Sequence, residues 1–167
     1  MGMDVHGKNN GAYFRRSVWG WHPLADLVCR LAPDLTSACK RWHTNDGDGL
    51  EEPLSLALAA RLRAALKDGT VTALVAHRNT KLAAIPDEIC AICSGTGVRS
   101  DDIGRQHNQH LRIIDQADHP RHGETGWCNG CEGRGKKRPF ATWYRVSVDD
   151  VREFADFLER CGGFSIC

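Results

Sequence analysis

Residues 90–97 read CAICSGTG and residues 128–135 read CNGCEGRG, so the pattern C-x-x-C-x-G-x-G occurs twice in the chain. Two residues between cysteines put both sulfurs on one side of a tight turn, where backbone amides can hydrogen-bond to the thiolates. Glycine suits such a turn because it adopts positive φ angles without steric cost. Two such turns supply the four thiolates of a closed, structural Zn²⁺ site. We predict one Zn²⁺ per chain, with the ligands Cys90, Cys93, Cys128 and Cys131.

Other chemistries of paired cysteines fit this pattern less well. A thioredoxin-type redox motif needs one C-x-x-C at the start of a helix, and the glycines here interrupt such a helix. Disulfides suit secreted chains, whereas the start Met-Gly-Met-Asp does not resemble a secretory signal. An iron–sulfur cluster also accepts four thiolates, and the spacing alone does not distinguish it from zinc.

The two phrases resemble the zinc-finger repeats of the DnaJ co-chaperone family, which also read C-x-x-C-x-G-x-G. In that family four repeats build two zinc sites, and the region helps to hold unfolded client proteins. The resemblance covers only residues 90–97 and 128–135, so it implies a single site here. The His-Pro-Asp tripeptide of a J-domain is missing from the chain, so the resemblance does not imply chaperone activity.

A looser resemblance runs along the whole chain, to uncharacterised small phage and prophage proteins. These share an opening Met-Gly-Met-Asp-Val-x-Gly, here residues 1–7, and the phrases at residues 42–50 (WHTNDGDGL) and 128–131 (CNGC). This resemblance implies a phage-type origin, and with it the cytoplasm of a host cell, but little chemistry.

Composition sets the class of protein. The 167 residues include 22 basic and 21 acidic side chains, and the net charge of +1 lacks the basic excess of a dedicated duplex-binding protein. No apolar run is long enough for a membrane span, so we expect a cytoplasmic protein without a membrane partner. The fold class that we predict is α+β, a small single domain with three or so helices, a few short strands and the cysteine knuckle pair.

We divide the chain into three parts. Residues 1–85 form a mainly helical N-terminal part, residues 86–146 a zinc-binding module with a long insertion at 98–127, and residues 147–167 a C-terminal helix that packs back. Helical spacing of apolar residues predicts helices at 23–31 and 51–67 and after a capping box at Ser147.

The remaining local predictions concern strands, turns and the aromatic cluster near the start of the chain. Strand formers predict strands at 71–76 and 140–146 and, less clearly, at 78–85. In the acidic stretch at 45–52, Thr44 and Ser55 fall where an EF-hand needs carboxylates, so we expect a turn whose Asp48 caps the next helix. The residues predicted to enter the core together are Tyr13, Phe14, Val18, Trp19 and Trp21.

Four cysteines lie outside the knuckles. Cys29 and Cys39 are predicted to be small buried hydrophobic residues. Cys161 and Cys167 have no C-x-x-C partner, and we expect free thiols.

The insertion at 98–127 holds two H-x-x-H pairs, His107 with His110 and His119 with His122. Such pairs could bind a second metal or activate a water molecule, but no carboxylate completes an H-E-x-x-H motif. We therefore expect a solvated or partner-contacting loop. Part of this loop is expected to pack against another surface, because it contains the apolar residues Leu111, Ile113 and Ile114.

Three functions compete. The first is a non-enzymatic zinc-binding phage-type protein that binds another protein, for example as an inhibitor of host machinery or of a defence system such as CRISPR. The second is nucleic-acid binding, with a basic run on phosphates and aromatic rings on bases. Its contact residues would be Lys136, Lys137, Arg138, Trp127 and Trp143. The third is a metal-dependent hydrolase that uses the histidine insertion. We rank them in this order, and expect no catalytic residues and no organic cofactor.

Overall fold

The computed structural model describes residues 2–9 and 11–167, which fold into two compact units. The sheet unit comprises residues up to Ala83 together with Trp143–Cys167, and the knuckle unit comprises Ala84–Thr142. Met1 and Asn10, which belong to the predicted N-terminal part, lie outside the described residues. The predicted α+β class is confirmed, with six α-helices and six strands in the described chain instead of three or so helices.

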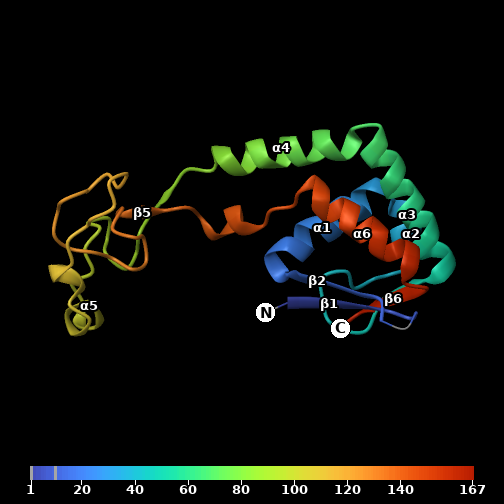
Figure 1. Cartoon of the computed structure of the whole chain (residues 1–167), viewed down its shortest axis with the longest axis horizontal. Coiled ribbons are helices and arrows are strands. Elements are labelled where there is room, and N and C mark those ends of the chain that lie inside the picture. The colour runs from blue at the N-terminus through green and yellow to red at the C-terminus, as the bar shows by residue number, and fades with distance from the viewer. Residues whose placement is uncertain (1, 10) are drawn as a thin grey trace. The chain divides into compact units, whose positions relative to one another are not determined.

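Strands and helices are interspersed along the chain, which begins with two strands and ends with a helix followed by a strand (Figure 1). The sheet unit contains β1 (Gly2–Gly7), β2 (Tyr13–Ser17), α1 (Val18–Leu31), α2 (Pro33–Thr36), β3 (Gly49–Glu51), α3 (Glu52–Lys67), α4 (Thr70–Ala84), α6 (Val148–Arg160) and β6 (Gly163–Ile166). The knuckle unit contains β4 (Glu88–Ile89), α5 (Asp102–Gln106), β5 (Lys136–Lys137) and the 3₁₀ helices η1 (Gln109–Leu111) and η2 (Phe140–Trp143), the last of which ends at the boundary. None of the described helices is both long and apolar enough to cross a membrane.

An antiparallel sheet in the order β2-β1-β6-β3 carries the sheet unit. Val5 of β1 lies opposite Phe14 on one side and Ile166 on the other, and Leu50 of β3 lies opposite Phe164. Because side chains alternate between the faces of a strand, this register puts all five on the same buried face. Figure 1 shows α1, α3 and α6 above that face.

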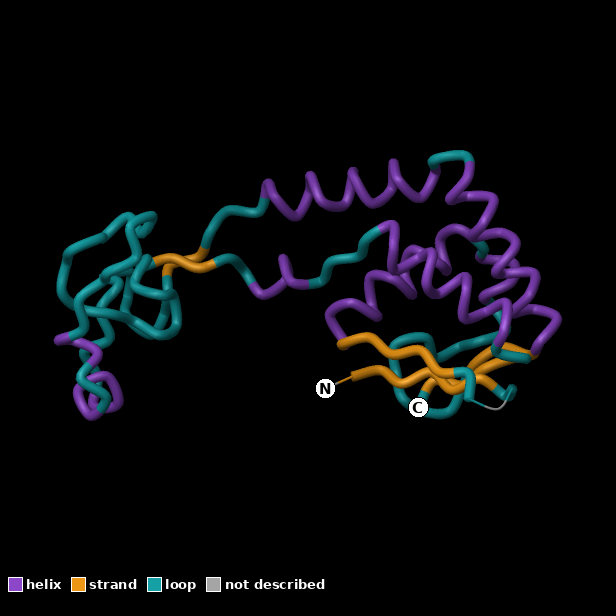
Figure 2. The backbone as a smooth tube through the Cα atoms, in the orientation of Figure 1, coloured by secondary structure: helices purple, strands orange, loops and turns teal. Residues whose placement is uncertain are grey.

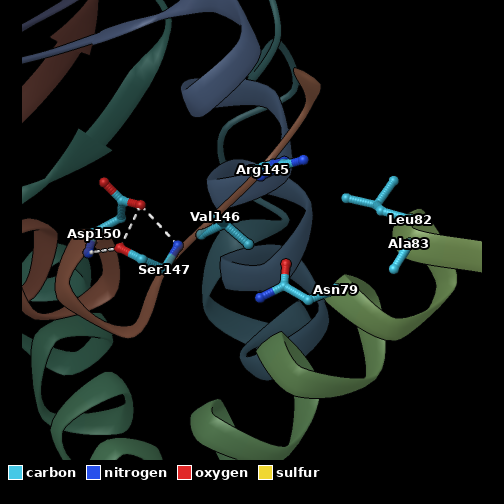
Figure 3. Close-up of a pocket in the computed structure, with 7 residues that line it drawn as sticks. All are labelled: Asn79, Leu82, Ala83, Arg145, Val146, Ser147 and Asp150. Carbon is cyan, nitrogen blue, oxygen red and sulfur yellow. Dashed lines mark hydrogen bonds between the residues drawn. The ribbon is translucent and has the colours of Figure 1, made fainter. Parts of the chain in front are cut away.

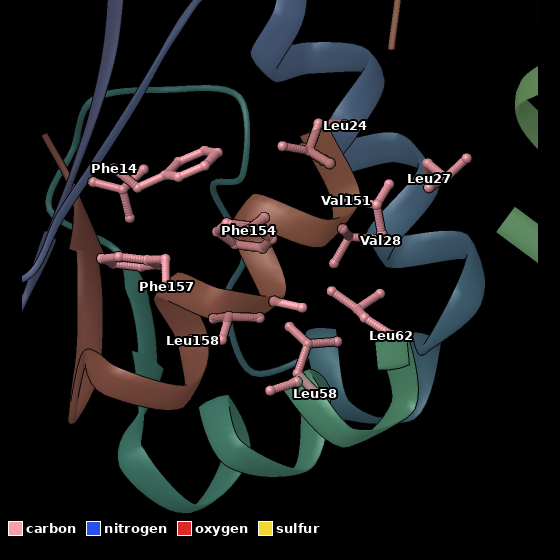
Figure 4. Packing of buried hydrophobic residues seen from close by; sticks show 14 of the residues in the cluster. Phe14, Leu24, Leu27, Val28, Leu58, Leu62, Val151, Phe154, Phe157 and Leu158 are labelled. Atoms are coloured by element: carbon pink, nitrogen blue, oxygen red, sulfur yellow. The ribbon is translucent and has the colours of Figure 1, made fainter. Parts of the chain in front are cut away.

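The apolar core fills the space between the sheet and the helices (Figure 4). Phe154 and Leu158 of α6 point toward Leu58 of α3, and all three are almost completely buried. The start of α6 is the predicted capping box, in which the Ser147 hydroxyl accepts the Asp150 N–H and the Asp150 carboxylate accepts the Ser147 N–H. The helix predicted at 51–67 is also confirmed, as α3.

Helix α1 begins five residues earlier than predicted. Ser17 caps it by accepting the Gly20 N–H at 3.2 Å, so Pro23 lies inside the helix and does not start it. The apolar period extends upstream because Trp21 is fully buried in register with Leu24. The prediction that the aromatic cluster packs in the core holds for Trp21 and Phe14, whereas Tyr13 is 49% exposed.

Residues 71–76, predicted to form a strand, belong to α4, as do all but the last of residues 78–85. The β-branched residues Val71 and Val75 are four apart, and both are buried on one helical face. Asp68 helps to start the helix, because its carboxylate accepts the Thr70 N–H at 2.9 Å. Tertiary packing of this stripe therefore outweighs the strand propensity of its residues.

Two further local predictions are wrong. Asp48 does not cap α3, because its carboxylate accepts N–H groups of Lys40, Arg41 and Gly49 and so holds together the loop before β3. Residues 140–146 do not form a strand. The Pro139 carbonyl accepts both the N–H and the hydroxyl of Thr142, at 2.9 and 2.7 Å, and these bonds close the turn of η2.

The cysteines outside the knuckles are all free thiols, as predicted for Cys161 and Cys167. Cys39 is buried as predicted, whereas Cys29 is only half-buried. Cys161 ends the buried stripe of α6, and burial raises the pKa of its thiol, as it does those of Cys29 and Cys39. A raised pKa keeps the thiols of Cys29, Cys39 and Cys161 in the protonated, less nucleophilic form at neutral pH.

Candidate metal centre

The knuckle unit has little regular structure, and most of its chain is loop (Figure 2). Its regular sheet consists of β4 paired antiparallel with β5, which joins the entry of the first knuckle to the exit of the second. The cluster of buried residues that this unit contains is made of Cys90, Cys93, Cys128 and Cys131. The two phrases that are 38 residues apart in sequence thus meet at the centre of the unit.

The two knuckles have the same backbone conformation. The residue after the second cysteine has a positive φ in both, 49° at Ser94 and 52° at Glu132. Both glycines of each phrase follow with positive φ, for example 76° at Gly97 and 74° at Gly135. Non-glycine residues rarely adopt this region, so the match at Ser94 and Glu132 shows that the repeat encodes a defined turn.

The glycines also let the two knuckles approach each other. A Cβ atom on Gly97 would lie 2.3 Å from the Gly133 carbonyl oxygen, and one on Gly135 would lie 2.2 Å from the Gly95 carbonyl oxygen. These two contacts are reciprocal, since the last glycine of each phrase faces the first glycine of the other. Glycine is therefore required here for space as well as for backbone angle.

The four sulfurs are spaced for a single tetrahedral ion. The Sγ atoms of Cys90 and Cys128 are 3.9 Å apart, those of Cys93 and Cys131 are 3.7 Å apart, and all four lie within 4.8 Å of one another. Bonds of about 2.3 Å from one metal ion to each sulfur would separate the sulfurs by about 3.8 Å in a regular tetrahedron. A disulfide needs a sulfur separation of about 2.05 Å, so these thiols are not paired. The cluster could hold a metal ion.

Backbone amides point at the sulfurs from equivalent places in the two knuckles. The Gly97 N–H donates to Cys93 Sγ and the Gly135 N–H donates to Cys131 Sγ, both at 3.2 Å. Such bonds favour the thiolate form, which is the form that binds metal.

The surroundings shift the pKa values of three of the four thiols, in both directions. Burial works against the thiolate of Cys90, but amide hydrogen bonds from Cys93 and Ile92 outweigh it and lower the pKa to about 7. Burial raises the pKa of Cys131 to about 12, and it raises that of Cys128 as well. A metal ion bound by these sulfurs would offset both the burial and the mutual repulsion of thiolates.

His119 anchors the insertion to the second knuckle. Its Nδ1 accepts the Arg121 N–H at 3.0 Å, which leaves Nε2 to donate its hydrogen to the Glu132 carbonyl at 2.8 Å. The ring is 5% exposed and packs beside Trp127. Both ring nitrogens are used, so His119 supports the turn at Glu132 and is no metal ligand.

Two arginines, which sequence reasoning did not single out, hold the insertion in place. Arg121 donates to the Gly133 carbonyl at 3.0 Å and pairs with Glu124 at 2.8 Å. Arg99 pairs with Asp101 and donates to Asn129 at 3.0 Å, which ties the exit of the first knuckle to the second. Because arginine is common in loops, residue type alone does not mark these two side chains. The one sequence signal is that Arg121 lies two residues after His119, close enough for its N–H to bond to the His119 ring.

The other insertion histidines do not assemble into a site. Within residues 2–9 and 11–167, the four cysteines are the one group of three or more histidines, cysteines or acids that is close enough to hold an ion. His107 is exposed, and His122 bonds through Nδ1 to the Gln116 carbonyl at 3.1 Å. His110 is half-buried, and its Nδ1 makes no hydrogen bond among the described residues.

The residues predicted to contact a partner or nucleic acid fall into two groups. Lys136 and Lys137 of β5 are exposed, and Trp143 is 57% exposed beside Trp19. By contrast, Arg138 donates to the Ile85 carbonyl and pairs with Asp87. Trp127 is only 9% exposed, and the Arg112 guanidinium lies over its ring at 4.2 Å from the centroid.

A hollow of about 450 Å³ in the sheet unit lies between α4 and the start of α6 (Figure 3). Its lining includes Asn79, Leu82, Arg145 and Asp150. Asp150 is occupied by the capping box and by Arg16, whose Nε donates to it at 2.9 Å. This hollow therefore offers no assembled set of reactive groups.

Comparison with protein-family models, with curated proteins and with solved structures finds no match to the chain. The site's geometry therefore carries the functional argument by itself.

Proposed function

We propose that the ion held by the four cysteines is Zn²⁺ and that its role is structural. The observation that carries this proposal is the tetrahedron of buried sulfurs, which no further histidine, cysteine or acidic side chain of the described residues joins. Zinc prefers this geometry, and four protein ligands leave no position for a substrate or water. A cluster of several irons would hold its thiolates on different metal atoms and so farther apart, which makes it a poorer fit.

The zinc in this proposal builds a binding surface, and the protein acts by binding another protein. The support is the number of large apolar side chains that the knuckle unit leaves exposed. They are Ile89 at 66%, Ile92 at 46%, Ile103 at 50%, Leu111 at 62%, Ile113 at 64% and Phe140 at 55%. A small metal module that displays this much apolar surface is typical of an interaction domain.

The resemblance of the two phrases to DnaJ-type repeats fits this role, since those repeats help to hold polypeptide clients. A phage-type origin and the inhibition of a host process such as CRISPR defence belong to the same proposal. They rest on the sequence resemblance alone, and the fold of the knuckle unit adds no support for either.

Neither competing function gains a comparable observation. For nucleic acid, two of the predicted contacts, Arg138 and Trp127, are already engaged within the knuckle unit, which leaves Lys136 and Lys137 as the exposed cations of the predicted contact set. For a hydrolase, His119 and His122 bond to backbone groups of their own unit and share no metal geometry.

A zinc-dependent capture experiment tests the proposal. The tagged, zinc-loaded chain should retain a stoichiometric protein from host lysate, and the Cys93→Ser/Cys131→Ser variant should lose both the zinc and the captured protein. The Cys29→Ser variant is the matched control, because this half-buried thiol lies outside the cluster. Capture of nucleic acid alone, or capture that is equal with and without zinc, would contradict the proposal.

A further inference from the structure

The segment around Ile113 pairs with another part of the insertion along one edge of its backbone, whereas the N–H and C=O groups on the opposite edge have no partner among the described residues. Ile113 lies opposite Thr125 in an isolated antiparallel bridge. The hydrogen bonds flank this pair, from Ile114 N–H at 3.0 Å and from Gly126 N–H at 2.7 Å. In a pair of this kind the N–H and C=O of the bridging residue point away from the partner strand. Within the described chain, neither Ile113 nor Asp115 has a backbone hydrogen bond.

The side chains of residues 113–115 alternate as those of a strand do, and this short run follows the 3₁₀ helix η1, which ends at Leu111. Ile114 is 1% exposed, whereas Ile113 before it is 64% exposed and Asp115 after it is also exposed. Leu111, two residues before Ile113, is 62% exposed. Open backbone groups beside exposed apolar side chains are the features that let a sheet edge accept a further strand.

The open edge leads toward an acidic hollow. This hollow of about 390 Å³ lies beside the second knuckle and is lined by Gln116, Asp118, His119, Trp127, Glu132 and Arg134. The lining holds two carboxylates, those of Asp118 and Glu132, and one guanidinium, that of Arg134. Among the described residues, neither of these carboxylates nor that of Asp115, which lies just outside the lining, forms an ion pair. The local charge therefore favours a cationic side chain.

We propose that the knuckle unit binds an extended segment of a partner protein as an added strand along residues 112–115, whose open backbone groups are those of Ile113 and Asp115, with a lysine or arginine of that segment in the hollow. This inference rests on the proposed function and specifies its binding mode and partner chemistry. A second copy of the chain fits this edge less well, because antiparallel pairing about Ile113 would place Asp115 opposite the apolar Leu111.

Two synthetic peptides test the proposal against the zinc-loaded full chain. Both are capped six-residue peptides of alternating threonine and valine, and the last residue is lysine in one and norleucine in the other. In titration calorimetry at low salt the lysine peptide should bind about threefold to fivefold more tightly. Asp118→Asn should remove this preference and leave the norleucine peptide unaffected.

Variants of Ile113 separate the backbone edge from the apolar side chain. Ile113→Pro removes the open N–H, and the extended backbone of Arg112 before it, with φ −68° and ψ 125°, suits a residue that precedes a proline. Binding of both peptides should fall about tenfold or more. Ile113→Thr keeps the N–H and should lose less than Ile113→Pro.

Each variant is first shown to hold one zinc, so that a failed fold is recognised. No binding of either peptide to the zinc-loaded chain would overturn the proposal, as would equal binding by Ile113→Pro. A dimer that Ile113→Pro dissociates would identify the occupant as a second copy and also overturn it. Zinc-dependent capture of a protein partner that persists in Ile113→Pro would leave the proposed function standing and reject this binding mode.

Discussion

The two units of the chain differ in what they bury. The sheet unit buries a continuous apolar core between one sheet face and its helices. The knuckle unit has no such core, and its buried cluster consists of four cysteine sulfurs. Beyond that cluster, its buried apolar side chains are Ile114 and Trp127 among the described residues.

Taken with the proposed zinc site, this difference accounts for the source of each unit's free energy of folding. Apolar burial of about 25 cal/mol per Å² sustains the sheet unit, whereas the knuckle unit buries too little apolar surface to offset its chain entropy. Binding of a structural zinc ion provides on the order of 10 kcal/mol, which is enough to order such a module. The apolar side chains that the knuckle unit does not need for a core stay exposed and can bind a partner.

Metal removal should give the largest difference in amide protection between the two units. A strong chelator should abolish amide protection throughout residues 90–135, because the metal supplies on the order of 10 kcal/mol there. The sheet unit should keep the protection of β1 and α6. Hydrogen exchange read by mass spectrometry measures both, and a knuckle unit that stays protected without metal would break the comparison.

A cavity in the apolar core should destabilise the sheet unit and leave the knuckle unit unchanged. Phe154 is fully buried against Phe14 and Phe164, with ring centroids 5.2 and 6.1 Å away. Phe154→Ala should lower the free energy of unfolding of the sheet unit by about 3 to 5 kcal/mol. Denaturant unfolding measures this loss, and zinc stoichiometry and affinity should stay unchanged. A parallel loss of zinc would show that the units do not fold independently.

Two glycines of the knuckle unit distinguish the effect of backbone angle from the effect of close packing between the knuckles. Gly135 and Gly123 have nearly the same φ, 74° and 79°, but only Gly135 is crowded, by the Gly95 carbonyl oxygen. Gly123→Ala should cost about 1 to 2 kcal/mol for its backbone angle alone. Gly135→Ala should cost more and weaken zinc binding, as measured by competition with a chromophoric chelator. Equal effects would mean that the close approach of the knuckles is unimportant.

The smallest expected effect concerns the acid dependence of the sheet unit. Burial alone would raise the pKa of Asp150, but hydrogen bonds from Ser147 and the guanidinium of Arg16 hold it below its usual value. A carboxyl with a lowered pKa stabilises the fold above its unfolded pKa of about 3.9, and that stability is lost as the pH falls through the folded value.

Asp150→Asn should therefore cost about 1 kcal/mol at neutral pH and flatten the loss of stability below about pH 4. Thermal unfolding of wild type and variant between neutral and acidic pH measures this difference. Asp149→Asn, which changes an exposed neighbour in the same helical turn, is the control. An unchanged acid profile in Asp150→Asn would exclude a role for this carboxylate.

The sequence predicted best what is encoded locally. The four clustered cysteines follow from a repeated phrase. The helix at 148–160 follows from its capping box and apolar stripe, and the helix at 52–67 follows from its apolar stripe alone, because the cap predicted for it at Asp48 is wrong. The strand predicted at 71–76 failed because Val71 and Val75 fit a strand and a buried helical stripe equally well until the packing partners are known. Propensity alone does not decide such a case.

The surroundings of the metal centre were beyond sequence reasoning for a different reason. His119 and Arg121 act through the backbone carbonyls of Glu132 and Gly133, and any residue type there presents the same carbonyl. The open edge at Ile113 also depends on pairing with Thr125, twelve residues away. Such contacts leave little trace in residue type or spacing, so they become visible only when the chain is folded.

In the proposed structure of the holo protein, one metal ion bound by four cysteine sulfurs holds the knuckle unit in its folded form. X-ray absorption at the zinc edge, combined with metal analysis of the purified chain, tests this most directly. We expect one zinc per chain with four sulfur neighbours at about 2.3 Å and no nitrogen or oxygen in the first coordination sphere. A folded knuckle unit without metal, or a zinc ion bound by histidine, would contradict the account.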